Sequence, residues 1–136
     1  GKQIVGDEPF LIDYDRVTGI WQTVWLEPVP DLYLLDAWSR FDRARGELVV
    51  QARSSAPTRA ALEVVVRRDG REVARASAWF QERSSATVAL ALAQPVLWSP
   101  DSPALYDLEL RLVDGGLELD RVESYAGLRE VTCEDG

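Results

Sequence analysis

Carboxyl side chains are the groups in this sequence best suited to acid–base chemistry. The 136 residues include 23 Asp and Glu, no His and a single Cys, Cys133. Without an imidazole the chain holds no Ser–His–Asp triad and no histidine metal ligand. Asp13 and Asp15 can share one face of a strand, but no pattern marks either as buried. The sequence therefore predicts no catalytic residue, metal site, cofactor or internal disulfide.

The overall charge and the apolar pattern exclude two classes of partner. The formal net charge is −8, and nucleic-acid binding depends on Lys and Arg that neutralise phosphates. No run of about eighteen apolar residues is present, so no membrane span is expected. The five Trp predict a packed core rather than disorder.

Apolar residues alternate with polar ones at a period of two, which is typical of half-buried strands. The clearest runs cover residues 48–52, 62–66, 88–92 and 106–112. Residues 74–78 are rich in Ala and have a helical composition, but their place directly after a turn favours a strand.

Turn residues separate these runs. Asp69-Gly70 and Asp114-Gly115-Gly116 are strong hairpin signals. Residues 54–57 and 94–95 are predicted to be loops. We count seven strands between about Leu32 and Tyr125. The predicted fold is all-β: an immunoglobulin-like β-sandwich of about seven antiparallel strands without a disulfide.

The two flanks of the sandwich have a different character. Residues 20–26 are apolar on both faces of an extended chain, with Trp21 and Trp25 on the same face, and the prolines at 28 and 30 end this segment. We expect residues 1–30 to be the last strand and linker of a preceding domain, 31–126 the sandwich, and 127–136 an exit linker. The chain has no Met, even at position 1, so we expect it to be a piece of a longer protein.

Several motifs resemble those of glycoside hydrolase family 2, in the order and at the spacing found in that family. Residues 16–29 resemble the closing strand of the family's sugar-binding jelly-roll domain. Three further motifs are similar to its sandwich domain and exit: Leu97-Trp98-Ser99-Pro100, Pro103-Ala104-Leu105-Tyr106 and Tyr125-Ala126-Gly127-Leu128-Arg129.

The resemblance implies a parent enzyme of the β-galactosidase, β-glucuronidase or β-mannosidase type, a retaining glycosidase that uses two carboxylates. In the family both carboxylates lie on a (β/α)8 barrel, which begins after the Gly-Leu-Arg motif. This chain does not include that barrel. Asp13 matches an acidic position at the edge of the family's sugar pocket, so it is the one candidate substrate-binding residue. The implied partners are the chain's own sugar-binding domain, the barrel and the parent enzyme's carbohydrate.

Seven residues are expected to have structural or interdomain roles. Trp21 and Trp25 should pack on an adjoining sheet or domain, and Trp98 should close one end of the sandwich. Tyr106 should bury its ring and bond nearby backbone, as in a tyrosine corner. Gly127 should take a positive φ, and Leu128 and Arg129 should dock on the barrel.

Three functions remain open from the sequence. The favoured one is a non-catalytic connector between the sugar-binding domain and the barrel, with exposed apolar patches that could drive self-association. The second is an autonomous carbohydrate-binding module, which needs aromatic residues clustered on one exposed face. The third is an adhesion-type immunoglobulin-like domain. The fold alone does not separate these functions.

Overall fold

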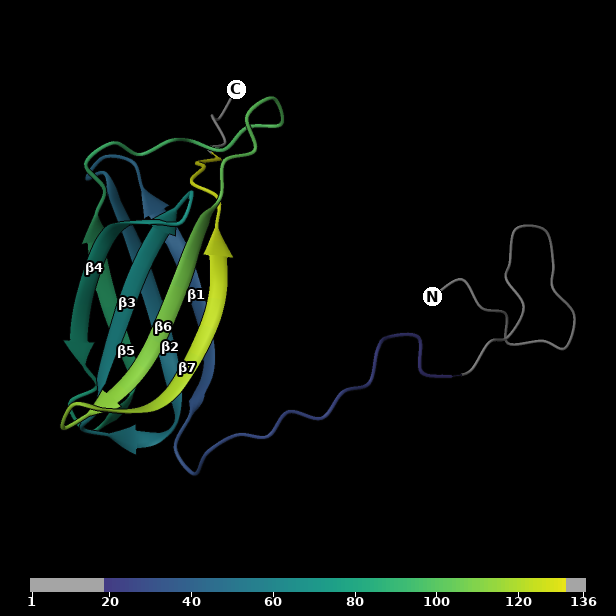
Figure 1. The fold of residues 1–136 in the computed structure, drawn as a ribbon, viewed down its shortest axis with the longest axis vertical. Coiled ribbons are helices and arrows are strands. Elements are labelled where there is room, and N and C mark those ends of the chain that lie inside the picture. Colours follow the sequence, from purple (N-terminus) through teal and green to yellow (C-terminus); the bar gives the residue numbers. More distant parts are fainter. Residues whose placement is uncertain (1–18, 132–136) are drawn as a thin grey trace, which may run out of the picture.

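The computed structural model describes residues 19–131, so Asp13 and Cys133 lie outside the described residues. Seven antiparallel strands form two packed sheets, which confirms the predicted all-β sandwich (Figure 1). One sheet has the order β1-β2-β5 and the other β4-β3-β6-β7. The strands are β1 (Leu34–Asp42), β2 (Glu47–Thr58), β3 (Ala61–Arg68), β4 (Arg71–Trp79), β5 (Arg83–Ala91), β6 (Tyr106–Asp114) and β7 (Leu117–Ala126).

The core lies between the sheets and is built from the alternating residues of the predicted runs. On β6, for example, Leu108, Leu110 and Leu112 are at most 3% exposed, while the residues between them point outward. Phe80, between β4 and β5, is also buried in this core. Burial of these side chains is the main source of stability available to a sandwich without a disulfide.

Two hairpins follow the turn chemistry of the sequence. Asp69 and Gly70 have φ values of 51° and 74°, and Gly115 and Gly116 have 56° and 85°. Two successive positive φ values are those of a type I′ turn, whose twist matches that of the flanking strands. These turns join β3 to β4 and β6 to β7.

One loop prediction is wrong, and one ambiguous segment is settled. Residues 54–57 belong to β2, which runs to Thr58 through a register shift. Ser54 is 3% exposed, and its hydroxyl donates a hydrogen bond to the carbonyl of Ala56 (2.7 Å). That local bond gives the serine-rich segment its irregular course within the strand. The Ala-rich residues 74–78 lie in β4, as favoured.

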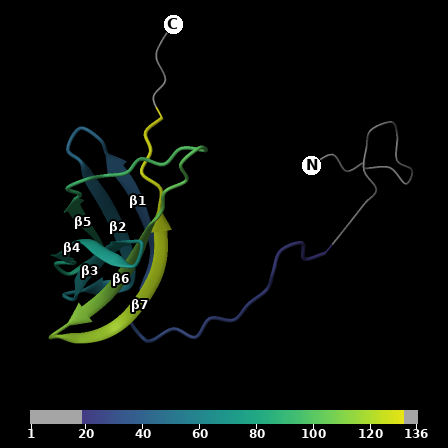
Figure 2. The same ribbon diagram turned by 45° about the horizontal axis from the view of Figure 1, so that its top comes forward.

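The chain enters and leaves the sandwich at opposite ends. β1 begins at Leu34 at the end where residues 19–33 arrive, and β7 delivers the chain to the other end at Ala126 (Figures 1 and 2). Residues 19–33 form no strand in this structure. The strands have eight to twelve residues, so the two ends of the sandwich are about 30 Å apart. Among the described residues, no helix is long and apolar enough to cross a membrane.

Candidate functional site

The end where the chain leaves the sandwich gathers most of the predicted structural residues. The backbone N–H of Trp98 donates a hydrogen bond to the carbonyl of Leu128 (2.8 Å), which ties the β5–β6 connection to the exit segment. Gly127 lies directly against the indole: a Cβ added there would meet Trp98 Cδ1 and Cγ at 3.3 Å. The predicted positive φ at Gly127 is wrong. Close approach of the Trp98 ring, not an unusual backbone angle, explains the glycine.

The two residues after Gly127 have different environments. Leu128 is 0% exposed and belongs to the core of the sandwich, so the expectation that it docks on another domain is wrong. Arg129 is exposed, and its guanidinium carbon lies 5.4 Å from the centroid of the Trp98 ring, within the range of a cation–π contact. Trp98, Gly127, Leu128 and Arg129 together form what we name the exit latch.

Tyr106 supports the same end from inside. It is the first residue of β6 and is 2% exposed. Its hydroxyl accepts a hydrogen bond from the backbone N–H of Val96 (2.9 Å), two residues before Trp98. The guanidinium of Arg68 lies 5.9 Å from the centroid of its ring. The ring and Arg68 also line a hollow of about 300 Å³ between the β3–β4 turn and residues 92–94.

Tyr106→Phe should lower the free energy of unfolding by about 1 kcal/mol, because the Val96 N–H loses its partner while the ring stays buried. Urea denaturation followed by circular dichroism measures this. Tyr125→Phe is the matched control, since Tyr125 is 70% exposed and its loss should be below about 0.5 kcal/mol. If both variants unfold at the same urea concentration, the Tyr106 hydroxyl does not stabilise the exit latch.

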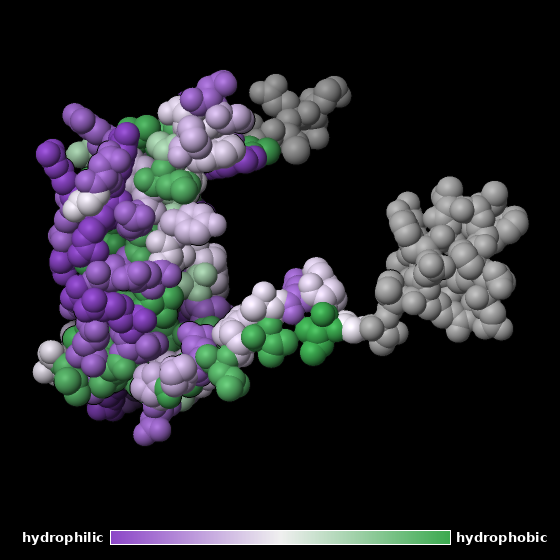
Figure 3. Space-filling view, turned by 45° about the vertical axis from the view of Figure 1, so that its right-hand side comes forward, coloured by the Kyte–Doolittle hydropathy of each residue, from purple (hydrophilic) through white to green (hydrophobic). Residues whose placement is uncertain are grey.

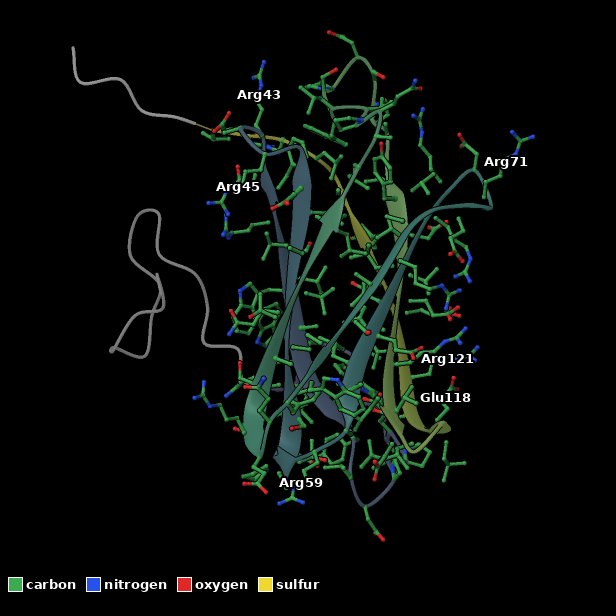
Figure 4. All side chains as sticks on the ribbon, turned by 90° about the vertical axis from the view of Figure 1, so that its left-hand side faces the viewer. Arg43, Arg45, Arg59, Arg71, Glu118 and Arg121 are labelled. Atoms are coloured by element: carbon green, nitrogen blue, oxygen red, sulfur yellow. The ribbon has the colours of Figure 1, made fainter. Side chains whose placement is uncertain are left out.

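A network of charged residues covers the outer face of the four-stranded sheet. Glu109 on β6 accepts a hydrogen bond from Arg67 on β3 (2.9 Å) and pairs with Arg111. Arg111 also contacts Glu118 on β7 (3.5 Å), which pairs with Arg121 (3.0 Å). Figure 4 shows Glu118 and Arg121 beside one another on this sheet.

The charge network lowers the pKa of Glu109 and covers the side chain of Val65. Burial alone would raise the pKa of Glu109, but hydrogen bonds and charge from Arg111 and Arg67 together hold that pKa below its ordinary value. Val65 points to this outer face between Arg75 and Glu109, yet it is 0% exposed. The aliphatic stems of long charged side chains can cover an apolar residue in this way.

Two predicted structural residues, Trp21 and Trp25, are not part of the exit latch. Trp21 and Trp25 are 87% and 71% exposed on the segment before β1, far along the chain from the exit latch. Asp13 lies outside the described residues. Trp98 is half-buried at the exit end. Four of the predicted residues do lie together at the exit end: Trp98, Tyr106, Gly127 and Arg129.

Three described carboxylates, Asp36, Glu72 and Glu109, are paired with Arg side chains. Resolved pKa shifts at Asp36, Glu72 and Glu109 are all downward, and each carboxyl is hydrogen-bonded to Arg. A glycosidase acid needs the opposite shift, a carboxyl whose pKa is raised. Within residues 19–131, no group of three His, Cys, Asp or Glu could hold a metal ion.

Sequence reasoning missed two of these features. The burial of Leu128 was missed because the residue follows the last strand, where no alternation marks a core position. The charge network was missed because charged residues at alternate positions of a strand, such as Glu109 and Arg111, are typical of a solvent-exposed face. A usable signal was present in β3, where three consecutive valines (64–66) imply that both faces of the strand are covered.

The fold and the exit latch define an immunoglobulin-like sandwich domain with an anchored exit segment. The chain belongs to the glycosyl hydrolases family 2, whose family model matches residues 32–129.

Two relatives match nearly the whole chain. A beta-galactosidase of Thermoanaerobacter pseudethanolicus is 26% identical over 137 residues, which is 94% of this chain and 18% of the relative. A beta-galactosidase of Lactococcus lactis is 29% identical over 129 residues, which is 91% of this chain and 12% of the relative. The chain thus spans less than a fifth of the relatives it matches.

Solved structures agree on the fold. A glycosyl hydrolase family 2 member from Bacteroides cellulosilyticus superposes with a TM-score of 0.64 at 24% identity, over 74% of this chain and 15% of that chain. A β-glucuronidase from Ruminococcus gnavus superposes with a TM-score of 0.58 at 19% identity, over 77% and 17%.

Proposed function

We propose that the chain is a non-catalytic connector domain of a larger family 2 glycoside hydrolase. The activity proposed for that enzyme is β-galactosidase-like hydrolysis of O-glycosyl bonds, in carbohydrate metabolism. The domain joins a sugar-binding domain on its N-terminal side to a catalytic barrel on its C-terminal side and sets their relative orientation.

The observation that carries this proposal is the placement of the two ends. The chain arrives at one end of the sandwich and leaves at the other, about 30 Å away. At the exit, Leu128 is 0% exposed, and the Trp98 N–H bonds its carbonyl (2.8 Å). A segment anchored in the core leaves in one direction, and a fixed direction is what a spacer between two domains requires.

The aromatic side chains favour the connector over a carbohydrate-binding module. Exposed aromatic residues within the sandwich sit on different strands: Trp38 on β1, Trp79 on β4 and Tyr125 on β7. Trp79 lies on β4, which β3 and β6 separate from β7, so the three rings do not gather on one surface. A sugar-stacking surface needs such rings side by side on one face.

The domain boundaries remain part of the proposal. Residues 1–30 would supply the closing strand and linker of the sugar-binding domain, and residues from 127 onward would lead to the barrel. Since Leu128 packs in the core and Arg129 lies over the Trp98 ring, the free part of the exit begins after Arg129.

Asp13 is proposed to contact the sugar in the longer enzyme. A carboxylate at the edge of the pocket would accept hydrogen bonds from sugar hydroxyls. Asp13→Ala in that enzyme should reduce kcat/KM by about tenfold, the loss of roughly one charged hydrogen bond. Asp15→Ala is the matched control. Equal kinetics for Asp13→Ala and the unaltered enzyme would remove Asp13 from the pocket.

The connector role is tested by loosening the exit in the longer enzyme. Inserting Gly-Ser-Gly-Ser after Arg129 should lower turnover of nitrophenyl β-galactoside, because the barrel no longer keeps its orientation to the sugar-binding domain. The same insertion between Gly115 and Gly116, in a surface turn, is the control and should leave turnover unchanged. Unchanged turnover for both insertions would contradict the connector role.

The isolated chain supplies the second half of the test. It should show no turnover of nitrophenyl glycosides and no saturable binding of galactosides or mannosides. Turnover would contradict a non-catalytic domain, and saturable binding would instead support the carbohydrate-binding module.

A further inference from the structure

The chain enters the sandwich through two residues whose backbone groups are bonded to side chains and backbone of distant strands. The N–H of Tyr33 donates a hydrogen bond to the hydroxyl of Ser55 (3.2 Å), and the Tyr33 carbonyl accepts one from the Ser55 N–H (2.8 Å). The next N–H, of Leu34, donates to Oδ2 of Asp120 (2.7 Å). Leu34 is itself 7% exposed. We name Tyr33, Leu34, Ser55 and Asp120 the entry clamp, because their bonds fix the backbone where the chain joins β1.

The entry clamp reaches both sheets. Ser55 lies on β2, which pairs with β1 in the three-stranded sheet. Asp120 lies on β7, an outer strand of the four-stranded sheet. The bond from Leu34 to Asp120 therefore crosses from one sheet to the other. All of these contacts lie within this chain, so they do not depend on the domains that flank it.

Asp120 occupies a position where the strand pattern calls for an apolar side chain. It lies directly opposite Leu112, which is 0% exposed, so its side chain is on the core-facing side of β7 with that of Val122. A carboxylate that faces a core is costly unless a donor satisfies it. The Leu34 N–H is such a donor, and a hydrogen bond to a charged acceptor is stronger than one between neutral groups. This bond accounts for a half-buried carboxylate at this position.

β7 joins the entry clamp to the exit latch. From Asp120 the strand continues without interruption to Ala126, paired with β6 along this length, and Gly127 of the exit latch follows directly. Six residues of strand span about 20 Å. In Figure 1 this strand runs from the end where the chain enters to the end where it leaves. The entry and the exit are therefore attached to one paired strand.

The segment that precedes the clamp can carry a fixed direction outward. Pro28 and Pro30 restrict their φ angles to about −65°, which stiffens the backbone. Glu27 and Val29 line a hollow of about 200 Å³ with Val122 of β7, beside the clamp. Figure 3 shows the segment running out from the lower end of the sandwich. A direction set at the clamp is thus transmitted through several residues.

We propose that Asp120 is a positioning residue: by accepting the Leu34 N–H it fixes the direction in which the preceding sugar-binding domain is held relative to β7, and hence to the barrel. The proposal rests on the connector role. Asp120 acts through the entry segment and not on the substrate. Its effect on the reaction is to keep the preceding domain, and with it Asp13, in place at the sugar pocket.

Amide hydrogen exchange of this chain, followed by nuclear magnetic resonance, tests the clamp itself. Asp120→Ala should speed exchange of the Leu34 amide about tenfold, because its acceptor is lost. The amide of Leu110, on the central strand β6, should keep its rate, which separates local release from general loss of stability. Asp120→Asn keeps an oxygen acceptor and should restore most of the protection.

Glu123→Ala is the matched control for the exchange experiment. Glu123 is an exposed carboxylate on the same strand, so its removal should leave exchange at Leu34 unchanged. An equal rate at Leu34 in Asp120→Ala and in the unaltered chain would overturn the proposal. So would an equal acceleration at Leu34 and Leu110, which a purely structural role predicts.

Kinetics of the longer enzyme test the positioning role. Asp120→Ala should raise KM for nitrophenyl β-galactoside by about three- to tenfold and keep kcat, because the preceding domain holds the sugar less well while the barrel is untouched. Asp120→Asn should restore KM, and Glu123→Ala should leave it unchanged. An unchanged KM in Asp120→Ala would overturn the proposal, even if exchange at Leu34 is faster.

The insertion after Arg129 separates failure of this proposal from failure of the connector role. If the insertion lowers turnover but Asp120→Ala keeps its KM, the connector role stands and the positioning role of Asp120 is wrong. If the insertion leaves turnover unchanged but Asp120→Ala raises KM and Asp120→Asn restores it, the connector role fails and Asp120 still positions the preceding domain.

Discussion

Leu128→Ala is expected to lower the free energy of unfolding by about 2–5 kcal/mol, the range for a large-to-small change in a packed core. Leu128 follows the last strand, yet it is 0% exposed within the core cluster. Removing its side chain leaves a cavity at the end of the sandwich and weakens the contact that holds the exit segment. Urea denaturation followed by tryptophan fluorescence measures the loss.

Val131→Ala provides the comparison for this prediction. Val131 is in the same exit segment but is 71% exposed, so its truncation should change stability by less than about 0.5 kcal/mol. If Leu128→Ala and Val131→Ala unfold at the same urea concentration, the exit segment is not anchored in the core and the exit latch does not exist.

Glu109→Gln is expected to cost about 2 kcal/mol at pH 7, because the amide cannot replace the charge that pairs with both Arg67 and Arg111. The Glu109 side chain is 12% exposed, so water compensates little for the lost contacts. Glu123→Gln is the control: Glu123 lies opposite Glu109 on β7 and is exposed. Its effect should be below about 0.5 kcal/mol.

The cost of Glu109→Gln should also depend on pH, in a direction fixed by the lowered pKa of Glu109. A carboxyl with a lower pKa in the folded state stabilises the fold fully above its ordinary value of 4.5. That contribution falls as pH drops from there through the folded-state pKa. The difference between the two proteins should therefore shrink in acid. A difference that stays constant from pH 7 to the acid side would contradict the pairing.

Strands and turns were predictable from the sequence because each depends on local patterns. The alternation in β6 and β5, and the hairpin signals at Asp69-Gly70 and Gly115-Gly116, describe backbone geometry that neighbouring residues determine. The β2 extension was missed for the opposite reason. Ser54, Ser55 and Pro57 have turn propensities, and tertiary contacts override them through the buried Ser54 and the bond from Ser55 N–H to the carbonyl of Tyr33 (2.8 Å).

The candidate site was predictable in its residues but not in its contacts. Trp98, Tyr106, Gly127 and Arg129 were all selected from motifs, and the structure brings them to one end of the sandwich. The sequence carries no information on which face of Gly127 meets the indole, so a positive φ was the natural but wrong expectation. Contacts between residues about thirty positions apart follow from the fold and not from spacing.

The opposite placement of the two chain ends has a mechanical consequence. Tension applied through the two chain ends acts along β1 and along β7. β1 is hydrogen-bonded to β2, and β7 is hydrogen-bonded to β6. Hydrogen bonds in these antiparallel ladders are perpendicular to the strands. The load is therefore shared as shear by the whole length of each ladder instead of opening one bond after another. A domain loaded in this direction resists extension along its strands.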